Sequence, residues 1–479
     1  MRKFMPVIII WAAVLLAYFP TFFVYFSGDD FFMFKISLTN GSFGELIKLL
    51  GIYPFEERGI AFYRPLFREV LHNIYFNFFG LNHIPFRILL MGIHFINISL
   101  VYFLMQNIFR KKFLAFFISL FFGISAANVA TLYYIPGGIE SSGAVMFALL
   151  TIIFYKKYLA ECGFKFYLAS LGTFLLALSS HEIIIATPLI LLALSSKKFL
   201  IKIIPFFLFA AILLYIDIAK IGFSPVEVQY KFIFNPKTFG QSFIWYLSWG
   251  FGIPEMLQDF VLPGLNLNPS LMRYWGNFYK IIFPTFFVSI SLLITSTFYL
   301  LLKKNYAFFD KRFLVLLFWL MAGLLPVIFL PSHKSSHYLI FVLPTLWGII
   351  FYITNTLPKT LLFIFIISSL FLNIASIKLG EQTHWAATRG KLAEKLIKDF
   401  KSKYPVLPKG VIIYFENDPV YPFLTKEWGG TSKQASFILN NADALQLLYK
   451  DPTLQVFYED LGDMPKGFPP DKIYSLVAR

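Results

Sequence analysis

The feature that most constrains the fold is a series of apolar runs separated by short basic clusters. The runs recur from Met5 to Ile377, and the clusters between them include Arg110-Lys111-Lys112, Lys156-Lys157 and Lys303-Lys304. About 20 apolar residues in a helix cross the hydrocarbon layer of a membrane. Because 58% of the residues are hydrophobic, we expect a polytopic all-α membrane protein in contact with a lipid bilayer.

The lengths of the runs predict about eleven transmembrane helices. Two of them, Phe166–Ser180 and Ile183–Leu194, are short for a hydrocarbon core of about 30 Å. The predicted spans are Met5–Phe26, Phe86–Phe109, Phe113–Ile135, Ser141–Tyr155, Phe166–Ser180, Ile183–Leu194, Phe199–Ile218, Ile281–Leu302, Phe313–Leu330, Tyr338–Ile353 and Leu361–Ile377. Pro136-Gly137-Gly138 is expected to turn the chain between the third and fourth.

The basic residues are unevenly distributed and predict the orientation. Residues 1–379 hold 29 Lys and Arg against 14 Asp and Glu, whereas residues 380–479 hold 13 against 12. Cytoplasmic loops carry an excess of Lys and Arg. If the N-terminus is cytoplasmic, every basic cluster lies on the cytoplasmic side. The excess of Lys and Arg therefore indicates the topology, and we expect no nucleic-acid partner. We expect an integral protein of the cytoplasmic (inner) membrane, if bacterial, with an extracytoplasmic C-terminus.

Two long loops and the tail then lie outside the membrane domain, residues 1–379. The first loop, 27–85, contains Phe43–Leu50 and Pro65–Phe79, which are predicted to be interfacial helices. The second, 219–280, is rich in Pro, Asn and Trp, which is typical of the membrane interface. Residues 380–479 predict a small soluble α/β domain, with helices at His384–Tyr404 and Ala442–Tyr449 and strands at Gly410–Phe415, Leu454–Tyr458 and Ile473–Val477.

Ionisable residues collect on the predicted outer side, where loops of a bundle can converge on one cavity. Asp29 and Asp30 follow the first span, and two like charges beside a membrane raise at least one pKa. A carboxylate could remove a proton from an acceptor hydroxyl, while basic side chains could hold a phosphate leaving group. The other candidates for binding are Arg64, Glu140, His181, Glu182, His333, Lys334 and His337. The alternatives are a solvated helix end for the Asp pair, a snorkelling Arg64 and loop solvation for the histidines.

The order of these features resembles the GT-C superfamily of membrane glycosyltransferases, including protein mannosyltransferases and aminoarabinose transferases. The resemblance lies in Gly28-Asp29-Asp30, Tyr63-Arg64-Pro65-Leu66 and Phe79-Gly80-Leu81 with Arg87. The segment around His181-Glu182 is similar to a Ser-Lys-Glu element, with His181 in place of Lys. His337-Tyr338 is similar to an Arg-Tyr element, with His337 in place of Arg.

The resemblance implies a sugar donor linked to polyprenyl phosphate and an unknown glycan, lipid or protein acceptor. Asp29 would be the general base, with Asp30 beside it in the catalytic pair, and the anomeric carbon would usually be inverted. Some members use a divalent metal (Mg or Mn), for which Asp30, Glu140 or Glu182 could serve. Two other functions stay open: a sugar or lipid transporter or flippase, and a non-catalytic scaffold that binds the lipid-linked sugar.

Overall fold

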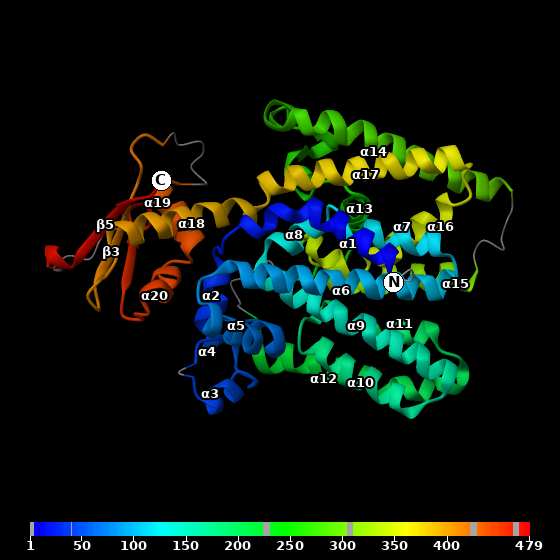
Figure 1. Ribbon diagram of the computed structural model, residues 1–479, viewed down its shortest axis with the longest axis horizontal. Helices are drawn as coiled ribbons and strands as arrows, with labels where there is room; N and C mark the ends of the chain where they lie inside the picture. The colour runs from blue at the N-terminus through cyan, green and yellow to red at the C-terminus, as the bar shows by residue number, and fades with distance from the viewer. Residues whose placement is uncertain (1–3, 40, 224–229, 304–309, 422–428, 463–468) are drawn as a thin grey trace.

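The computed structural model describes residues 4–39, 41–223, 230–303, 310–421, 429–462 and 469–479. It is a helical bundle with a small β-sheet at one end (Figure 1). Asn40 and residues 224–229, which fall in the two predicted external loops, lie outside the described residues.

Seven helical segments of the described chain are long and apolar enough to cross a membrane. The protein is therefore an integral, multi-pass membrane protein built from helices. The segments are Met5–Phe23 (α1, Met5–Tyr18, and η1, Phe19–Phe23), His83–Phe109 (α6), Ile135–Glu161 (α9), Lys197–Ile221 (η4, Lys197–Ile203, α12, Ile204–Tyr215, and η5, Ile216–Ile221), Ser270–Leu302 (α14), Lys311–Ile328 (α15) and Lys359–Thr383 (α17).

Four further apolar helices are shorter. They are Lys112–Gly123 (α7), Phe164–Leu178 (α10), Glu182–Leu194 (η3, Glu182–Ile184, and α11, Thr187–Leu194) and Leu343–Thr354 (α16). Each of the eleven predicted spans overlaps a member of one of these two sets. At about 1.5 Å per residue the shorter helices do not reach across the hydrocarbon core. The all-helical membrane class is confirmed, and the number eleven stays a prediction.

The predicted third span and the turn after it were wrong. Helix α7 ends at Gly123, because the Asn128 side chain donates to the carbonyls of Phe122 (2.7 Å) and Gly123 (3.2 Å) at its last turn. A short helix, α8 (Asn128–Tyr133), follows. The Pro136-Gly137-Gly138 segment begins α9 instead of turning the chain, since proline is well tolerated in a first helical turn. Glu140 therefore lies inside α9 and not in a loop.

The second predicted external loop is also more ordered than expected. Helix α13 (Pro236–Phe251) buries Tyr246 and Trp249, so Trp249 belongs to the protein interior and not to an interfacial belt. Helix α14 begins before the predicted Ile281. The short elements between them are η7 (Glu255–Phe260), β1 (Val261–Leu262), η8 (Pro263–Leu265) and β2 (Asn266–Leu267).

The first predicted external loop consists of short helices. Helices occur where they were predicted, at α3 (Phe43–Lys48) and at η2 and α5 (Pro65–Leu71 and His72–Phe79). Two others were not predicted, α2 (Asp29–Ile36) and α4 (Phe55–Arg58). Gly28 caps α2 with a φ of 49°, a left-handed value that favours glycine. The acidic pair therefore occupies the first turn of a helix.

The tail begins with α18 (Trp385–Lys403), which was predicted, and forms a parallel sheet in the order β4-β3-β5. Its elements are β3 (Ile412–Glu416), α19 (Thr431–Leu439), α20 (Asp443–Tyr449), β4 (Gln455–Tyr458), η11 (Glu459–Leu461), η12 (Pro470–Lys472) and β5 (Ile473–Val477). Helix α19 was missed. The tail contacts α2 directly: Lys35 and Asp443 form an ion pair of 2.6 Å, and the Gly28 amide donates to the Ile438 carbonyl at 2.7 Å.

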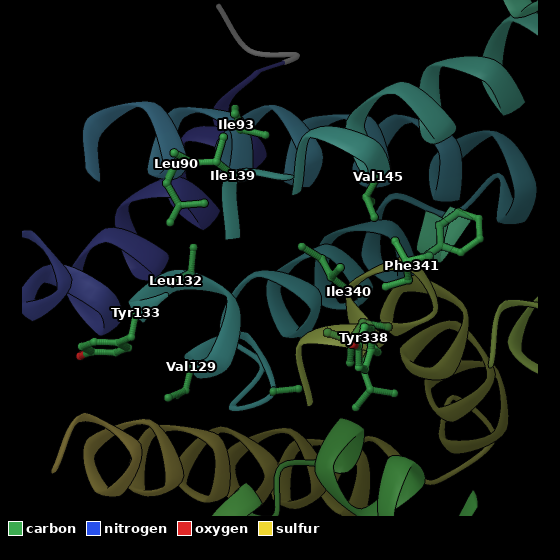
Figure 2. Packing of buried hydrophobic residues seen from close by; sticks show 14 of the residues in the cluster. Leu90, Ile93, Val129, Leu132, Tyr133, Ile139, Val145, Tyr338, Ile340 and Phe341 are labelled. Atoms are coloured by element: carbon green, nitrogen blue, oxygen red, sulfur yellow. The ribbon is translucent and has the colours of Figure 1, made fainter. Parts of the chain in front are cut away.

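In the core, α6 packs against α9, and α8 and α9 pack against η10 (Ser336–Phe341). Leu90 and Ile93 of α6, Ile139 of α9 and Ile340 of η10 are all buried (Figure 2). Gly138 allows this closeness, because a Cβ there would lie 2.0 Å from the Thr131 carbonyl oxygen of α8. The packing fixes the start of α9, which carries Glu140, against the segment that precedes α16.

Candidate functional site

The acidic pair divides into a buried and an accessible carboxylate. Asp30 is buried, and its Oδ2 accepts the Ser27 amide at 2.7 Å while Oδ1 has no partner; burial raises its pKa to about 7. Asp29 faces outward and accepts the Tyr134 hydroxyl at 3.3 Å. The surrounding protein removes enough water to raise the pKa of Asp29 above its ordinary 3.8. Asp29 is therefore the member of the pair that a substrate can reach.

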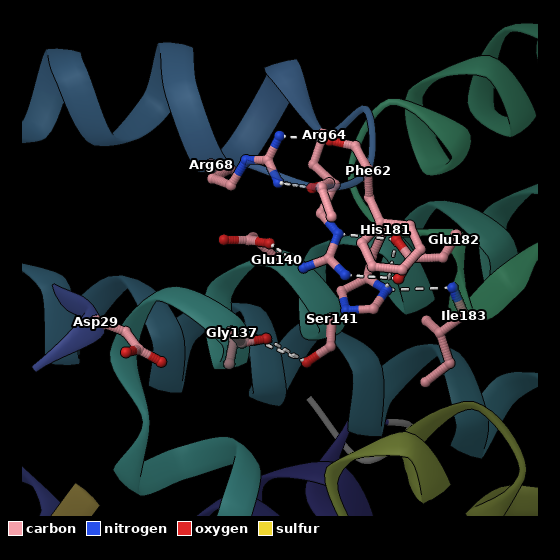
Figure 3. Close-up of polar contacts among 12 residues, drawn as sticks. Asp29, Phe62, Arg64, Arg68, Gly137, Glu140, Ser141, His181, Glu182 and Ile183 are labelled. Carbon is pink, nitrogen blue, oxygen red and sulfur yellow. Dashed lines mark hydrogen bonds and ion pairs between the residues drawn. The ribbon is translucent and has the colours of Figure 1, made fainter. Parts of the chain in front are cut away.

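Arg64 links two carboxylates from separate helical segments (Figure 3). Its Nε and Nη2 donate to the two carboxylate oxygens of Glu182 at 2.8 and 2.5 Å, and its Nη1 donates to Glu140 Oε2 at 2.8 Å. All three side chains are largely buried. Burial by itself would lower the pKa of Arg64, but the charges of Glu182 and Glu140 together with their hydrogen bonds outweigh it and raise the pKa, so the guanidinium stays charged. Arg64 is a structural bridge as well as a predicted phosphate ligand.

The loop that carries Arg64 is held by a second set of contacts. Arg68, one helical turn later, donates to the carbonyls of Ala61 (2.8 Å) and Phe62 (2.6 Å). Asp217 of η5 accepts the Tyr63 amide at 2.7 Å and is itself buried. The position of the guanidinium thus depends on α12 and η5 as well as on its own loop.

We expect Asp217→Leu to lower the free energy of unfolding by about 1–3 kcal/mol, because the Tyr63 amide would be left without an acceptor. Asp217→Asn keeps an oxygen in the same place and should lose much less. Thermal unfolding in detergent measures the difference. Equal effects of the two variants would contradict this role for Asp217.

One cavity of about 390 Å³, here called the polar cavity, gathers most of the predicted site residues. It lies between α2, the Arg64 loop, the start of α9 and the segment before α16. The predicted residues that line it are Asp29, Arg64, Glu140, His181, His333, His337 and Tyr338. Residues distant in sequence thus meet at one site that contains the accessible carboxylate.

Two of the predicted histidines at this cavity, His181 and His337, are neutral. His181 accepts the Ile183 amide at Nδ1 (3.2 Å), and burial together with Arg64 lowers its pKa to about 3. Its Nε2 therefore carries the proton. Burial also lowers the pKa of His337 well below its ordinary value. The rings of His333 and His337 pack against Tyr338. His181 and His337, two of the predicted phosphate ligands, are thus uncharged.

A second, mainly apolar cavity of about 500 Å³ adjoins the polar one. Side chains of α11, α12 and α15, including Leu189, Leu214 and Leu325, form part of its wall. Five residues line both cavities: Phe62, His181, Tyr230, His333 and Tyr338. The two cavities therefore adjoin along a boundary of Phe62 and of histidine and tyrosine side chains.

Three predicted residues lie elsewhere. Lys334 lines a different cavity. Glu182 lines the apolar cavity and holds Arg64, while Asp30 is bound to the Ser27 amide. Within the described ranges, no group of three or more His, Cys, Asp or Glu side chains could hold a metal ion. The divalent metal stays a prediction.

Sequence reasoning missed several residues of the site. Arg68 follows Arg64 by four positions, and a second arginine so close in sequence could have indicated it. Asp217 is a lone carboxylate at the end of a predicted span, and such residues are usually functional or paired. Trp385 and His384 also line the polar cavity, and no local pattern marks them.

Neither the protein-family models nor the curated proteins compared with this chain give a match.

Proposed function

We propose that the protein is a membrane glycosyltransferase of GT-C type. In this proposal it spans the membrane eleven times, with its C-terminus outside. It moves a sugar from a polyprenyl-phosphate donor to an acceptor on the extracytoplasmic face. The observation that supports it best is that the apolar cavity adjoins the polar cavity, which Asp29 lines. A lipid tail fits the first, and its phosphate would then lie at the shared boundary.

The boundary has the chemistry that a lipid-linked phosphate requires. The Nε2–H of His181 and the hydroxyl of Tyr338 can donate to phosphate oxygens. The remaining N–H groups of Arg64 add a charged donor, and charge-assisted hydrogen bonds are the stronger kind. Donors fixed before the reaction stabilise the charge that develops on the leaving group.

In the reaction, Asp29 accepts the proton of an acceptor hydroxyl. The hydroxyl oxygen attacks the anomeric carbon of the sugar and forms the new glycosidic bond. The bond between that carbon and the phosphate oxygen breaks, and polyprenyl phosphate leaves with the bonding electron pair. Attack from the side opposite the phosphate inverts the anomeric carbon.

The test is to incubate membranes containing the protein with a panel of labelled polyprenyl-phosphate sugars and to identify any glycosylated product. Transfer from one donor, with release of polyprenyl phosphate, supports the proposal. Movement of intact donor across reconstituted vesicles without transfer would instead indicate a transporter or flippase. Donor binding without transfer or hydrolysis would indicate a scaffold.

The pH dependence of transfer should follow Asp29. A base acts only when ionised, so activity is present above its pKa and is lost as the pH falls through it. Because burial raises that pKa above 3.8, we expect kcat/KM to fall at a pH above the ordinary aspartate range. Tyr134→Phe removes a hydrogen bond that lowers this pKa, so it should move the acid limb to higher pH. An acid limb at or below 3.8 in the wild type would contradict the assignment.

A further inference from the structure

A second polar cavity of about 300 Å³, here called the α17 cavity, adjoins the polar cavity and shares no lining residue with the apolar one. The end of α17, η7 and the segment before η10 enclose it. His384 and Trp385 line both this cavity and the polar cavity. The three cavities therefore form a row, with Asp29 in the middle one.

The α17 cavity has many hydrogen-bonding groups. Glu255 accepts the amide and the hydroxyl of Ser336 at 3.1 and 2.5 Å. The hydroxyl of Ser376, 1% exposed, has no hydrogen-bond partner. Gln258, Asp259, Lys334 and Thr383 add further donors and acceptors to its wall. A buried polar group without a partner is costly, so a ligand that offers hydroxyls would relieve that cost.

An aromatic ring stands where the α17 cavity meets the polar cavity. The Trp385 ring lies 5.0 Å from that of Tyr134, centroid to centroid, and Tyr134 donates to Asp29. Arg389 lies 5.4 Å from the centre of the same Trp385 ring. An aromatic face suits the apolar side of a sugar ring, while the polar wall suits its hydroxyls. A lipid tail would leave these polar groups unpaired.

We infer that the α17 cavity binds the acceptor and that the acceptor is a saccharide, whose reacting hydroxyl passes Trp385 to reach Asp29. The inference rests on the proposed function, because it assigns the second substrate of the same reaction. It distinguishes a glycan acceptor from a lipid or an apolar peptide segment.

The test blocks the cavity with a reagent. The exposed Cys162 is first replaced by serine. Thr383→Cys then places a single thiol in the wall of the α17 cavity, and a bulky charged methanethiosulfonate modifies that thiol. Lys378→Cys, on the half-exposed surface of the same helix, is the matched control. We expect modified Thr383→Cys to lose about 10²-fold in transfer while hydrolysis of the donor by water continues. The modified control should keep both activities.

Protection by sugar gives a readout that needs no transfer. A mixture of maltose, cellobiose and chitobiose should slow the modification of Thr383→Cys and leave that of Lys378→Cys unchanged. Absence of protection, or normal transfer by the modified Thr383→Cys protein, would overturn the inference. If the unmodified protein neither transfers nor hydrolyses any donor, the proposed function fails, and the protection result still decides whether the cavity binds saccharide.

Discussion

Asp29→Asn is expected to reduce transfer by about 10³-fold, the usual scale for loss of a general base. The amide keeps the size of the side chain and can still accept the Tyr134 hydroxyl, but it cannot take a proton from the acceptor. Folding and donor binding should therefore persist. Initial rates with saturating donor measure the loss, and binding of labelled donor to the purified variant shows that the donor site is intact.

Two carboxylate substitutions serve as comparisons for Asp29→Asn. Asp30→Asn alters a buried group that the substrate does not reach, so its main effect should be on stability. Glu56→Gln removes an exposed carboxylate from the same external segment and should leave transfer unchanged. Unaltered transfer in Asp29→Asn would end the assignment of Asp29 as the base.

Arg64→Ala is expected to lower the free energy of unfolding by about 3–5 kcal/mol, because Glu140 and Glu182 would stay buried without their shared partner. Arg64→Lys should recover only part of this loss, since an ammonium cannot present the planar pair of donors that Glu182 receives. Thermal unfolding in detergent measures both variants. Arg273→Ala, at an exposed arginine of α14, is the control for the loss of one positive charge.

Neutralising the carboxylates tests the same explanation in the opposite direction. In Arg64→Ala, the further changes Glu140→Gln and Glu182→Gln remove the unpaired charges, so the triple variant should be more stable than Arg64→Ala alone. If the triple variant is less stable, the loss comes from packing around Arg64 and not from uncompensated charge.

The sequence predicted the membrane class well because long apolar runs have few alternative folds. It failed where tertiary contacts decided the local structure. Asn128 ends α7 through the hydrogen bonds of its side chain. The segment with Pro136 and two glycines begins α9, because Gly138 has no Cβ and can pack against the backbone of α8. Trp249 is buried, but the composition of its segment is the same whether the tryptophan lies in the protein interior or at the membrane interface.

The candidate site was predictable in its residues but not in its contacts. Asp29, Arg64, Glu140 and His181 each stood out as ionisable groups next to apolar runs, and the structure brings them to one cavity. The sequence could not reveal that Arg64 binds both Glu140 and Glu182 or that His181 and His337 are neutral. Those properties come from distances and burial, which depend on the whole fold.

The bond between the Gly28 amide and the Ile438 carbonyl has a consequence for biosynthesis. Ile438 is translated about four hundred residues after Asp29. Contacts so distant in sequence form late in folding. The turn that carries Asp29 is therefore completed only after the tail has been synthesised and has docked on α2.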